Sequence, residues 1–246
     1  PANGEKLRGA VLALADRLDP TLEAWISANI CFPSSMVDSI TPATDEALID
    51  RVGNRGGYVD TWPIQREEFT SWVIEKPDRA EFPALDKVGA IFSENVALHE
   101  QAKLRLLNGA HSTLAYLGLA YGNSSVAEAM TNEDLRTKIA KMMTDEIAPS
   151  LTPPDGVDLK AYTQALLERF ANPAIDHKLS QIAWDGSQKL PIRLLATIRD
   201  NIALNRSFEG LATGVAAWMR FVIRITTDQA KLTDPMGKKL QRIAST

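Results

Sequence analysis

Residues 96–121 read VALHEQAKLRLLNGAHSTLAYLGLAY, and this stretch decides the fold class of the chain. Its apolar residues recur at intervals of three and four, which is typical of an α-helix with a buried face. The pattern predicts one long helix over these residues, with a kink near Asn108 and Gly109 because glycine weakens a helix interior. No segment after about Val96 has the features of a strand, so we expect the rest of the chain to be a helical array.

Local signals place the other helices of this array. Asn132 is suited to cap a helix, and Glu133 and Asp134 follow in the first turn, where the helix dipole favours negative charge. Asn172-Pro173 and Asp185-Gly186 are expected to separate helices. The helices are predicted over residues 132–147, 159–170, 175–183, 190–204 and 211–225, with a turn at 153–156.

Residues 1–95 have a mixed pattern. Helical spacing over residues 7–18 is followed by a second helix through Ile26, which Cys31-Phe32-Pro33 ends. Aromatic and β-branched residues at 69–74 predict a strand. Residues 34–40 fit a strand or a loop, residues 45–52 a short helix, 53–57 a glycine-rich loop, and Phe92 a weaker strand. We therefore divide the chain into a small α/β segment, residues 1–95, and a helical domain, residues 96–246.

Composition excludes several classes of protein. The chain of 246 residues carries 27 Lys and Arg against 31 Asp and Glu, a net charge of -4, so a basic nucleic-acid binder is not expected. A single cysteine cannot form an internal disulfide, and Cys31, beside Phe32, is predicted to be a buried, inert thiol. The sequence contains no run of about 18 apolar residues, so no membrane-spanning helix is expected. Residues 1–5 lack the apolar core of a signal peptide. We expect a cytoplasmic protein without nucleic-acid or membrane partners.

Several catalytic motifs are missing from the sequence. It contains no Gly-x-Gly-x-x-Gly after a predicted strand, no Walker loop and no Gly-x-Ser-x-Gly elbow. The glycines at 53–57 lack the strand–loop–helix context of a phosphate cradle. His99, His111 and His177 do not have the spacing of metal ligands, so no metal site is expected.

Three polar residues of the long helix form a candidate site. On an ideal helix His111 lies about 80° and Asn108 about 140° around the axis from Lys103. A lysine in an apolar setting can serve as general acid and base, an asparagine amide can stabilise a developing alkoxide, and a histidine can orient the substrate. The set suits interconversion of a carbonyl and an alcohol without a metal. Spacing alone favours the non-catalytic interpretation, in which Lys103 is a solvated surface residue, Asn108 a helix-kink residue and His111 a core histidine.

The residues around this set resemble the long-chain mannitol dehydrogenase family. Lys103-x4-Asn108-x2-His111 within LNGAHS looks like the family signature. The family includes mannitol 2-dehydrogenase, arabinitol dehydrogenases and fructuronate reductase, also called mannonate oxidoreductase. Further matching blocks are FPSSMVDSITP (32–42), WVIE (72–75), FANP (170–173), DGSQKLP (185–191) with Arg193, and GVAAWMR (214–220).

The resemblance implies a fold and an activity. The fold would be mainly α, a helical C-terminal dehydrogenase domain like that of 6-phosphogluconate dehydrogenase, with a small α/β remnant of a Rossmann domain. The activity would be NAD- or NADP-dependent oxidation of a secondary alcohol of a polyol or hexuronate. Family members also carry a complete N-terminal Rossmann domain and a longer C-terminus. We expect this chain to be a fragment that is inactive alone and whose cofactor contacts lie mostly outside it.

The resemblance also implies roles for single residues. Lys103 would be the catalytic acid and base, Asn108 would polarise the C2 oxygen, and His111 would bind a substrate hydroxyl. Further substrate contacts would come from Val37, Asp38, Gln181, Lys189 and Arg193. Asp38 is equally explained as a cap, and Lys189 as part of a surface ion pair.

The substrate branch rests on fewer residues. Gln181 stands where mannitol dehydrogenases carry Arg, and the block 181–193 looks more like the fructuronate reductase branch. Lys189 and Arg193 lie four residues apart, where both could face a carboxylate, or simply solvent. Ser39 and Trp184 depart from the family pattern. We favour a fructuronate- or mannonate-type substrate over a neutral polyol, and a monomer or weak homo-oligomer. A helical ligand-binding module without catalysis is the alternative of another class.

Overall fold

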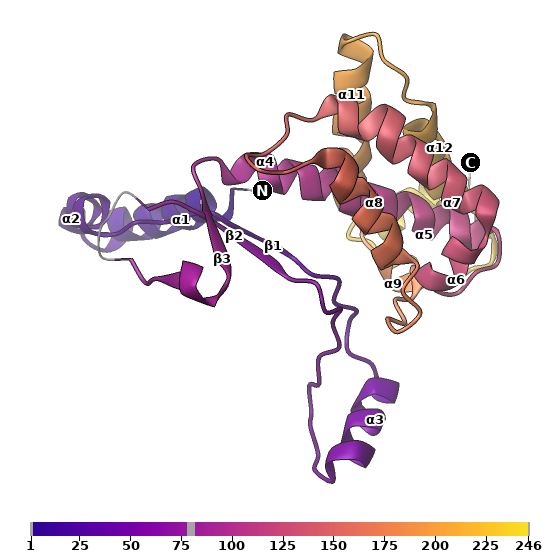
Figure 1. Ribbon diagram of the computed structural model, residues 1–246, viewed down its shortest axis with the longest axis horizontal. Coiled ribbons are helices and arrows are strands. Elements are labelled where there is room, and N and C mark those ends of the chain that lie inside the picture. The colour runs from indigo at the N-terminus through magenta and orange to yellow at the C-terminus, as the bar shows by residue number, and fades with distance from the viewer. Residues whose placement is uncertain (1, 78–81, 246) are drawn as a thin grey trace. The chain divides into compact units, whose positions relative to one another are not determined.

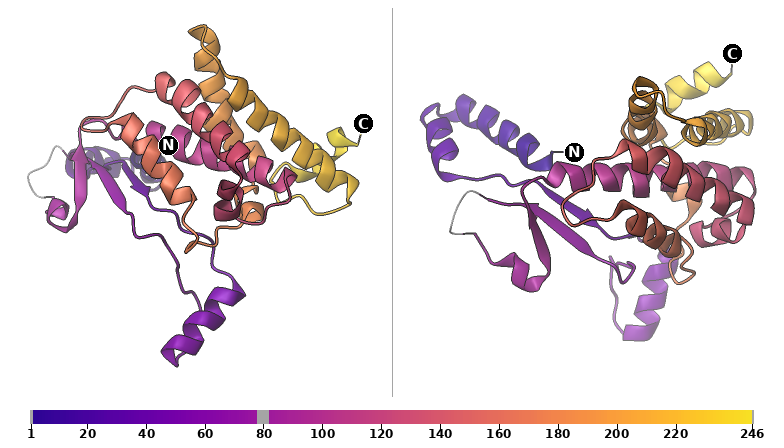
Figure 2. Two further views of the ribbon diagram at one scale, coloured as in Figure 1. Left: turned by 45° about the vertical axis from the view of Figure 1, so that its right-hand side comes forward. Right: turned by 45° about the horizontal axis from the view of Figure 1, so that its top comes forward.

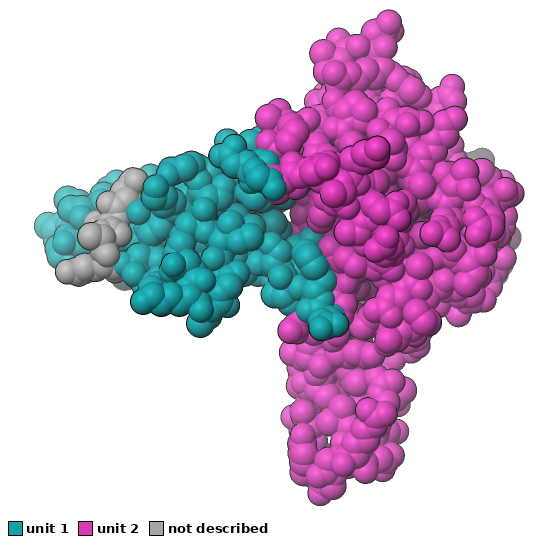
Figure 3. Space-filling view, viewed as in Figure 1, with its two compact units in different colours: residues 1–39, 68–101, 154–156 teal, residues 40–67, 102–153, 157–246 magenta. Residues whose placement is uncertain are grey.

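The computed structural model describes residues 2–77 and 82–245, and the chain divides into two compact units (Figure 3). Unit 1 falls within residues 1–39, 68–101 and 154–156. Unit 2 falls within residues 40–67, 102–153 and 157–246. The mainly α fold class with a small α/β portion is confirmed.

Unit 1 is built on a three-stranded sheet with the order β1-β2-β3 (Figure 1). β1 pairs antiparallel with β2, placing Met36 opposite Val73, and β2 pairs parallel with β3. Met36, Val73 and Val96 form a small buried cluster. The elements of unit 1 are α1 (Asn3–Leu18), α2 (Thr21–Asn29), β1 (Ser35–Asp38), β2 (Ser71–Glu75), η1 (Leu85–Val88), β3 (Ala90–Ser93) and α4 (Val96–Ala102), whose last residue belongs to unit 2.

Unit 2 is a helical array around α5 (Ala110–Ala120), which packs against α12, α9 and α7 (Figures 1 and 2). α5 is apolar or small on every side, so it can be buried all round. Its neighbours approach closely where side chains are small: a Cβ on Gly214 of α12 would lie 2.5 Å from Thr113 Oγ1. The other elements are α3 (Glu46–Gly56), η2 (Lys103–Gly109), α6 (Val126–Thr131), α7 (Glu133–Lys141), η3 (Met142–Ile147), η4 (Ala148–Ser150), α8 (Leu159–Phe170), α9 (Leu179–Ile182), α10 (Gly186–Leu190), η5 (Pro191–Leu195), α11 (Ala196–Ala203), α12 (Glu209–Thr227) and α13 (Gly237–Ala244).

Residues 40–67 are tied to the helical array by ion pairs. Arg169 at the end of α8 donates to both carboxylate oxygens of Glu67, at 2.9 and 2.6 Å, and both side chains are buried. Glu67 also accepts from the Ile40 amide at 2.5 Å. Lys178 donates to Asp45 at 2.7 Å. These contacts explain why the segment with α3 belongs to unit 2 although β1 and β2, on either side of it, belong to unit 1.

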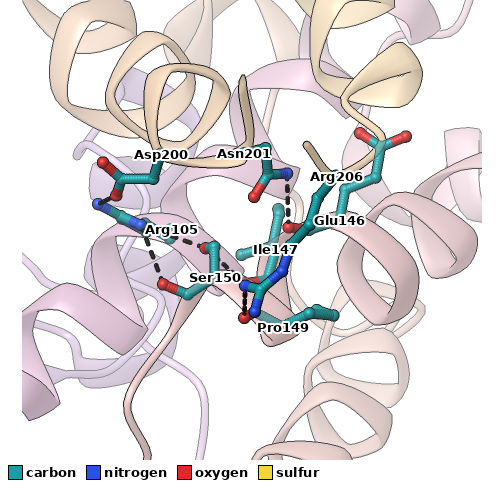
Figure 4. A network of polar contacts seen from close by, with 8 residues as sticks. All are labelled: Arg105, Glu146, Ile147, Pro149, Ser150, Asp200, Asn201 and Arg206. Atoms are coloured by element: carbon teal, nitrogen blue, oxygen red, sulfur yellow. Dashed lines mark hydrogen bonds and ion pairs between the residues drawn. The ribbon is translucent and has the colours of Figure 1, made fainter. Parts of the chain in front are cut away.

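Polar contacts join η2, η3, η4 and α11 (Figure 4). Arg105 donates to Ser150 Oγ at 3.2 Å and to Asp200 at 2.5 Å. Asn201 donates to the carbonyl of Glu146 at 3.0 Å. The buried Glu146 carboxylate accepts from the amides of Gly210 and Leu211, the first turn of α12, at 2.8 and 3.0 Å. The charged groups of this interior are thus satisfied by one another and by a helix end, whereas the buried Asn201 Oδ1 has no partner among the described residues.

Most predicted elements are confirmed. The strand at 69–74 is β2, the undecided segment 34–40 contains β1, and Phe92 lies in β3. The Asn132 side chain accepts from Asp134 and Leu135 as an N-cap. After residue 96, the described residues contain only one isolated β-bridge, between Ser125 and Lys178.

Three expectations were wrong. Residues 53–56 are the last turn of α3, and Gly57, with φ 66°, is its C-cap, so the glycines end a helix and form no loop of their own. The helix expected over 175–183 is only α9, because the bridge to Ser125 holds Lys178 extended. Cys31 is exposed.

None of the helices in the described ranges is both long enough and apolar enough to cross a membrane.

Candidate active site

Lys103 and Asn108 lie on the π-helix η2. Hydrogen bonds in a π-helix join residues five apart, so Asn108 follows Lys103 by about one turn. The two side chains are therefore closer in angle than the α-helical estimate of about 140°. The expected kink near Asn108 and Gly109 is this change of winding, since regular α-helix resumes at Ala110. Isolated π-turns are frequent at functional sites.

A second π-helix, η5, packs on the first. A Cβ on Gly109 would lie 2.9 Å from the carbonyl oxygen of Arg193, so only glycine permits this approach. The Arg193 guanidinium donates to Ser112 Oγ at 2.9 Å and approaches the Asn108 carbonyl at 3.5 Å. Burial lowers the pKa of Arg193. Arg193 therefore braces the helix that carries Asn108.

His111 is buried three residues beyond Asn108. Its ring stacks on Phe170, with centroids 5.0 Å apart, and meets the ring of His177 edge-on at 4.8 Å. Burial holds the pKa of His111 well below its usual value, and the nearby cationic groups add to the shift. His111 is thus neutral at physiological pH. Its buried Nε2 has no partner among the described residues, so it is available to a ligand.

His177 belongs to the same cluster, and the sequence analysis did not place it there. Burial, and then the charge of Lys189, lower the pKa of His177 to about 4, while Asp176 acts in the opposite direction. Its Nδ1 is buried without a hydrogen-bond partner in the described chain. Sequence spacing could not reveal this residue, because 66 positions separate it from His111 and only the packing of α5 against the segment before α9 brings them together.

Lys189 and Gln181 flank this cluster. Lys189 is half-buried on α10 and donates to the Ile182 carbonyl at 3.3 Å. Burial and the charge of Arg193 lower the pKa of Lys189, while Asp185 and Asp234 raise it. The Asp234 carboxylate is itself engaged by Ser187, at 2.8 and 2.6 Å. The Gln181 side-chain oxygen is buried and has no partner among the described residues.

Two cationic side chains of the site, Lys189 and Arg193, have no ion-pair partner among the described residues. Removing a charge from water is costly unless an opposite charge compensates it. Near His111 the structure thus combines two cationic side chains that form no ion pair with a described residue and several unused hydrogen-bonding atoms, which suits a polar, anionic ligand.

The predicted site residues fall into two groups. Lys103, Asn108, His111, Gln181, Lys189 and Arg193 all belong to unit 2. Val37 and Asp38 lie on β1 of unit 1, where Val37 is half exposed and Asp38 is buried. The structure places the first group in one helical array.

Comparison with known proteins gives a consistent family. The family model of the mannitol dehydrogenase C-terminal domain matches residues 95–246, and that of the mannitol dehydrogenase Rossmann domain matches residues 1–87. D-mannonate oxidoreductase of Escherichia coli is 43% identical over 243 residues, covering 98% of this chain and 50% of the relative. Mannitol 2-dehydrogenase of Aspergillus fumigatus is 37% identical over 245 residues, covering 97% and 49%.

A solved structure has a similar fold. The ternary complex of Pseudomonas fluorescens mannitol 2-dehydrogenase with NAD and D-mannitol superposes with a TM-score of 0.87 at 36% sequence identity. The superposition covers 100% of this chain and 50% of the other. The chain therefore spans about half the length of the relatives that it matches.

Proposed function

The chain belongs to the mannitol dehydrogenase family, and on that premise we propose that it supplies the substrate and proton-transfer groups of an NAD(P)-dependent oxidoreductase. The reaction interconverts a secondary alcohol of a sugar-derived acid and its ketone. The observation that carries the proposal is the π-turn shared by Lys103 and Asn108, beside the unpartnered Nε2 of His111. The family matches support the reaction type.

In this proposal each residue of the set has one role. Lys103 takes the hydroxyl proton during oxidation and returns it during reduction. The Asn108 amide donates a hydrogen bond to the same oxygen and stabilises its alkoxide character in the transition state. The neutral His111 hydrogen-bonds a neighbouring substrate hydroxyl and fixes the orientation of the reacting carbon. The Arg193 guanidinium donates to Ser112 Oγ and so helps to hold the helix that carries these residues.

The substrate is proposed to be a hexuronate or the corresponding aldonate. Lys189 and Arg193 supply positive charge with no counter-ion among the described residues, and a substrate carboxylate would compensate it. Gln181 offers an amide to the sugar hydroxyls. Val37 and Asp38 remain proposed contacts of the sugar. A neutral polyol, as the names of the mannitol 2-dehydrogenase relatives suggest, is the second candidate.

NAD or NADP is the proposed cofactor, because a Rossmann family model matches residues 1–87 and a structural neighbour was solved with NAD. When bound, the nicotinamide supplies or accepts the hydride. The described residues show no glycine-rich turn between a strand and a helix, so we assign no residue of this chain to the dinucleotide phosphates. A boundary between residues 95 and 96, a monomer or weak homo-oligomer and a cytoplasmic location complete the proposal.

The direct test is NADH consumption by the full-length protein that contains this chain. Fructuronate, tagaturonate and fructose would be compared as substrates at equal concentration. We expect turnover with a uronate and little with fructose. Turnover with fructose alone would overturn the acidic-substrate assignment, and no turnover with any of them would favour a binding module without catalysis.

A further inference from the structure

We propose that His177 is a specificity-determining residue, whose imidazole donates a hydrogen bond from Nδ1 to the carboxylate of an acidic sugar while Lys189 balances the charge of that group. The proposal deepens the proposed function and rests on it. It assigns a residue outside the Lys103–Asn108–His111 set to one end of the substrate.

The main chain alone fixes the position of His177. Its amide donates to the Ile175 carbonyl at 2.9 Å, and its carbonyl accepts from the Val126 amide at 3.0 Å. The bridge between Ser125 and Lys178 holds the next residue in place. None of these bonds uses the imidazole. Its buried Nδ1 has no partner among the described residues and can donate to a ligand oxygen.

The ring of His177 lies directly beside the candidate site. It meets His111 edge-on at 4.8 Å, so a ligand that reaches the unpartnered Nε2 of His111 comes within a few ångströms of His177. A buried ring nitrogen without a hydrogen-bond partner destabilises the folded protein, because it has lost its bonds to water. A ligand oxygen would remove that destabilisation.

Charge indicates which ligand oxygen this is. Lys189 acts electrostatically on both His111 and His177, and it has no ion pair with a described residue. A carboxylate beside Lys189 would find the neutral imidazole as a second donor. A primary hydroxyl at the same place would leave the lysine charge uncompensated. The pair His177 and Lys189 should therefore distinguish an aldonate from the polyol of the same configuration.

The experiment compares D-mannonate with D-mannitol, which differ only in this end group. Each is titrated calorimetrically into the full-length protein saturated with NADH, a combination in which no hydride can move. The variants are His177→Leu, which removes the hydrogen bond, and His177→Asn, which keeps a nitrogen donor near the place of Nδ1. His99→Leu in unit 1 is the matched control, since His99 is also buried.

We expect His177→Leu to weaken mannonate binding about tenfold and mannitol binding less than twofold, as for loss of one hydrogen bond to a charged group. His177→Asn should recover part of the preference, and His99→Leu should leave the ratio of the two Kd values unchanged. An unchanged ratio in His177→Leu would overturn the inference, as would wild-type protein that does not bind mannonate.

Turnover separates this inference from the proposed function. If the wild-type protein oxidises NADH with a uronate, but His177→Leu leaves the ratio of the mannonate and mannitol Kd values unchanged, the proposed function stands and the inference about His177 is wrong. If the wild-type protein binds mannonate in a way that depends on His177 but shows no turnover, the recognition site stands and the dehydrogenase assignment is wrong.

Discussion

The carbonyl oxygen of Arg193 lies so near Gly109 that a Cβ added to the glycine would come within 2.9 Å of it. This contact presses one π-helix, η5, against another, η2, and the second carries both Lys103 and Asn108. The Arg193 guanidinium also donates a hydrogen bond to Ser112 Oγ at 2.9 Å. The helix that carries the proposed proton-transfer set is thus held in place by Arg193, which lies 85 residues beyond Asn108 in the chain.

Gly109→Ala is expected to separate the two helices. Alanine favours a helix by about 1 kcal/mol over glycine, but overpacking against a backbone oxygen costs about 1–3 kcal/mol. We expect a net loss of stability by chemical denaturation and a lower kcat. Gly9→Ala in α1 is the control, since a Cβ there meets nothing within 4 Å. Equal stability of the two variants would contradict the close contact.

Glu67→Gln should destabilise the fold through Arg169. The pair is buried, and losing one partner leaves a charge without compensation, which costs about 3–5 kcal/mol. The comparison is Glu94→Gln, whose exposed pair with Lys76 should contribute little to stability because water and salt screen it. Denaturant midpoints measure both. A loss at Glu67 as small as that at Glu94 would mean that the segment 40–67 is not held by this pair.

Glu146→Ala is expected to weaken the start of α12. The carboxylate accepts two amide hydrogen bonds there, at 2.8 and 3.0 Å, and its removal leaves buried donors unsatisfied. We expect a loss of about 1–3 kcal/mol in the free energy of unfolding. Asp145→Ala, at an exposed neighbouring position, should change it little. Hydrogen exchange of the first turn of α12 should accelerate only in the Glu146 variant.

Acid is expected to destabilise the protein partly through His177. Its pKa is about 4 in the folded state, below the ordinary value of 6.5, so the unfolded chain binds more protons between these values. Stability therefore rises with pH across this window, and it is lost as the pH falls from about 6.5 toward 4. Since His111 shifts in the same direction, His177→Asn should reduce the slope without abolishing it. A slope unchanged by His177→Asn would show that the folded protein does not hold this ring neutral.

The sequence was sufficient for the elements and for part of the site. Apolar periodicity located α5 and α8, and capping residues such as Asn132 located helix starts, because these are local properties. The resemblance supplied Lys103, Asn108 and His111 together. Local pattern could not supply the π-turn in η2, which depends on packing against η5, and Lys103 and Asn108 were therefore placed too far apart around the helix.

Long-range contacts explain the remaining differences. The sequence led us to consider His177 only as a possible metal ligand, since nothing near it in sequence indicates that its ring meets His111 at 4.8 Å. The substrate contact expected of Arg193 stays a prediction, and the structure adds a hydrogen bond from Arg193 to Ser112 that the sequence did not indicate. Both contacts, His177 with His111 and Arg193 with Ser112, arise from tertiary packing, which periodicity and spacing do not reveal.

The central claim is tested most directly by Lys103→Ala in the full-length protein. NADH oxidation with fructuronate would be followed across pH for the wild type, for Lys103→Ala and for the control Lys141→Ala, at an exposed position of α7. The proposed function predicts a loss of about 10²–10⁴ in kcat for Lys103→Ala alone, with calorimetric binding of mannonate retained. A Lys103→Ala protein that turns over within about threefold of wild type would contradict it, since no general acid and base would then reside at this position.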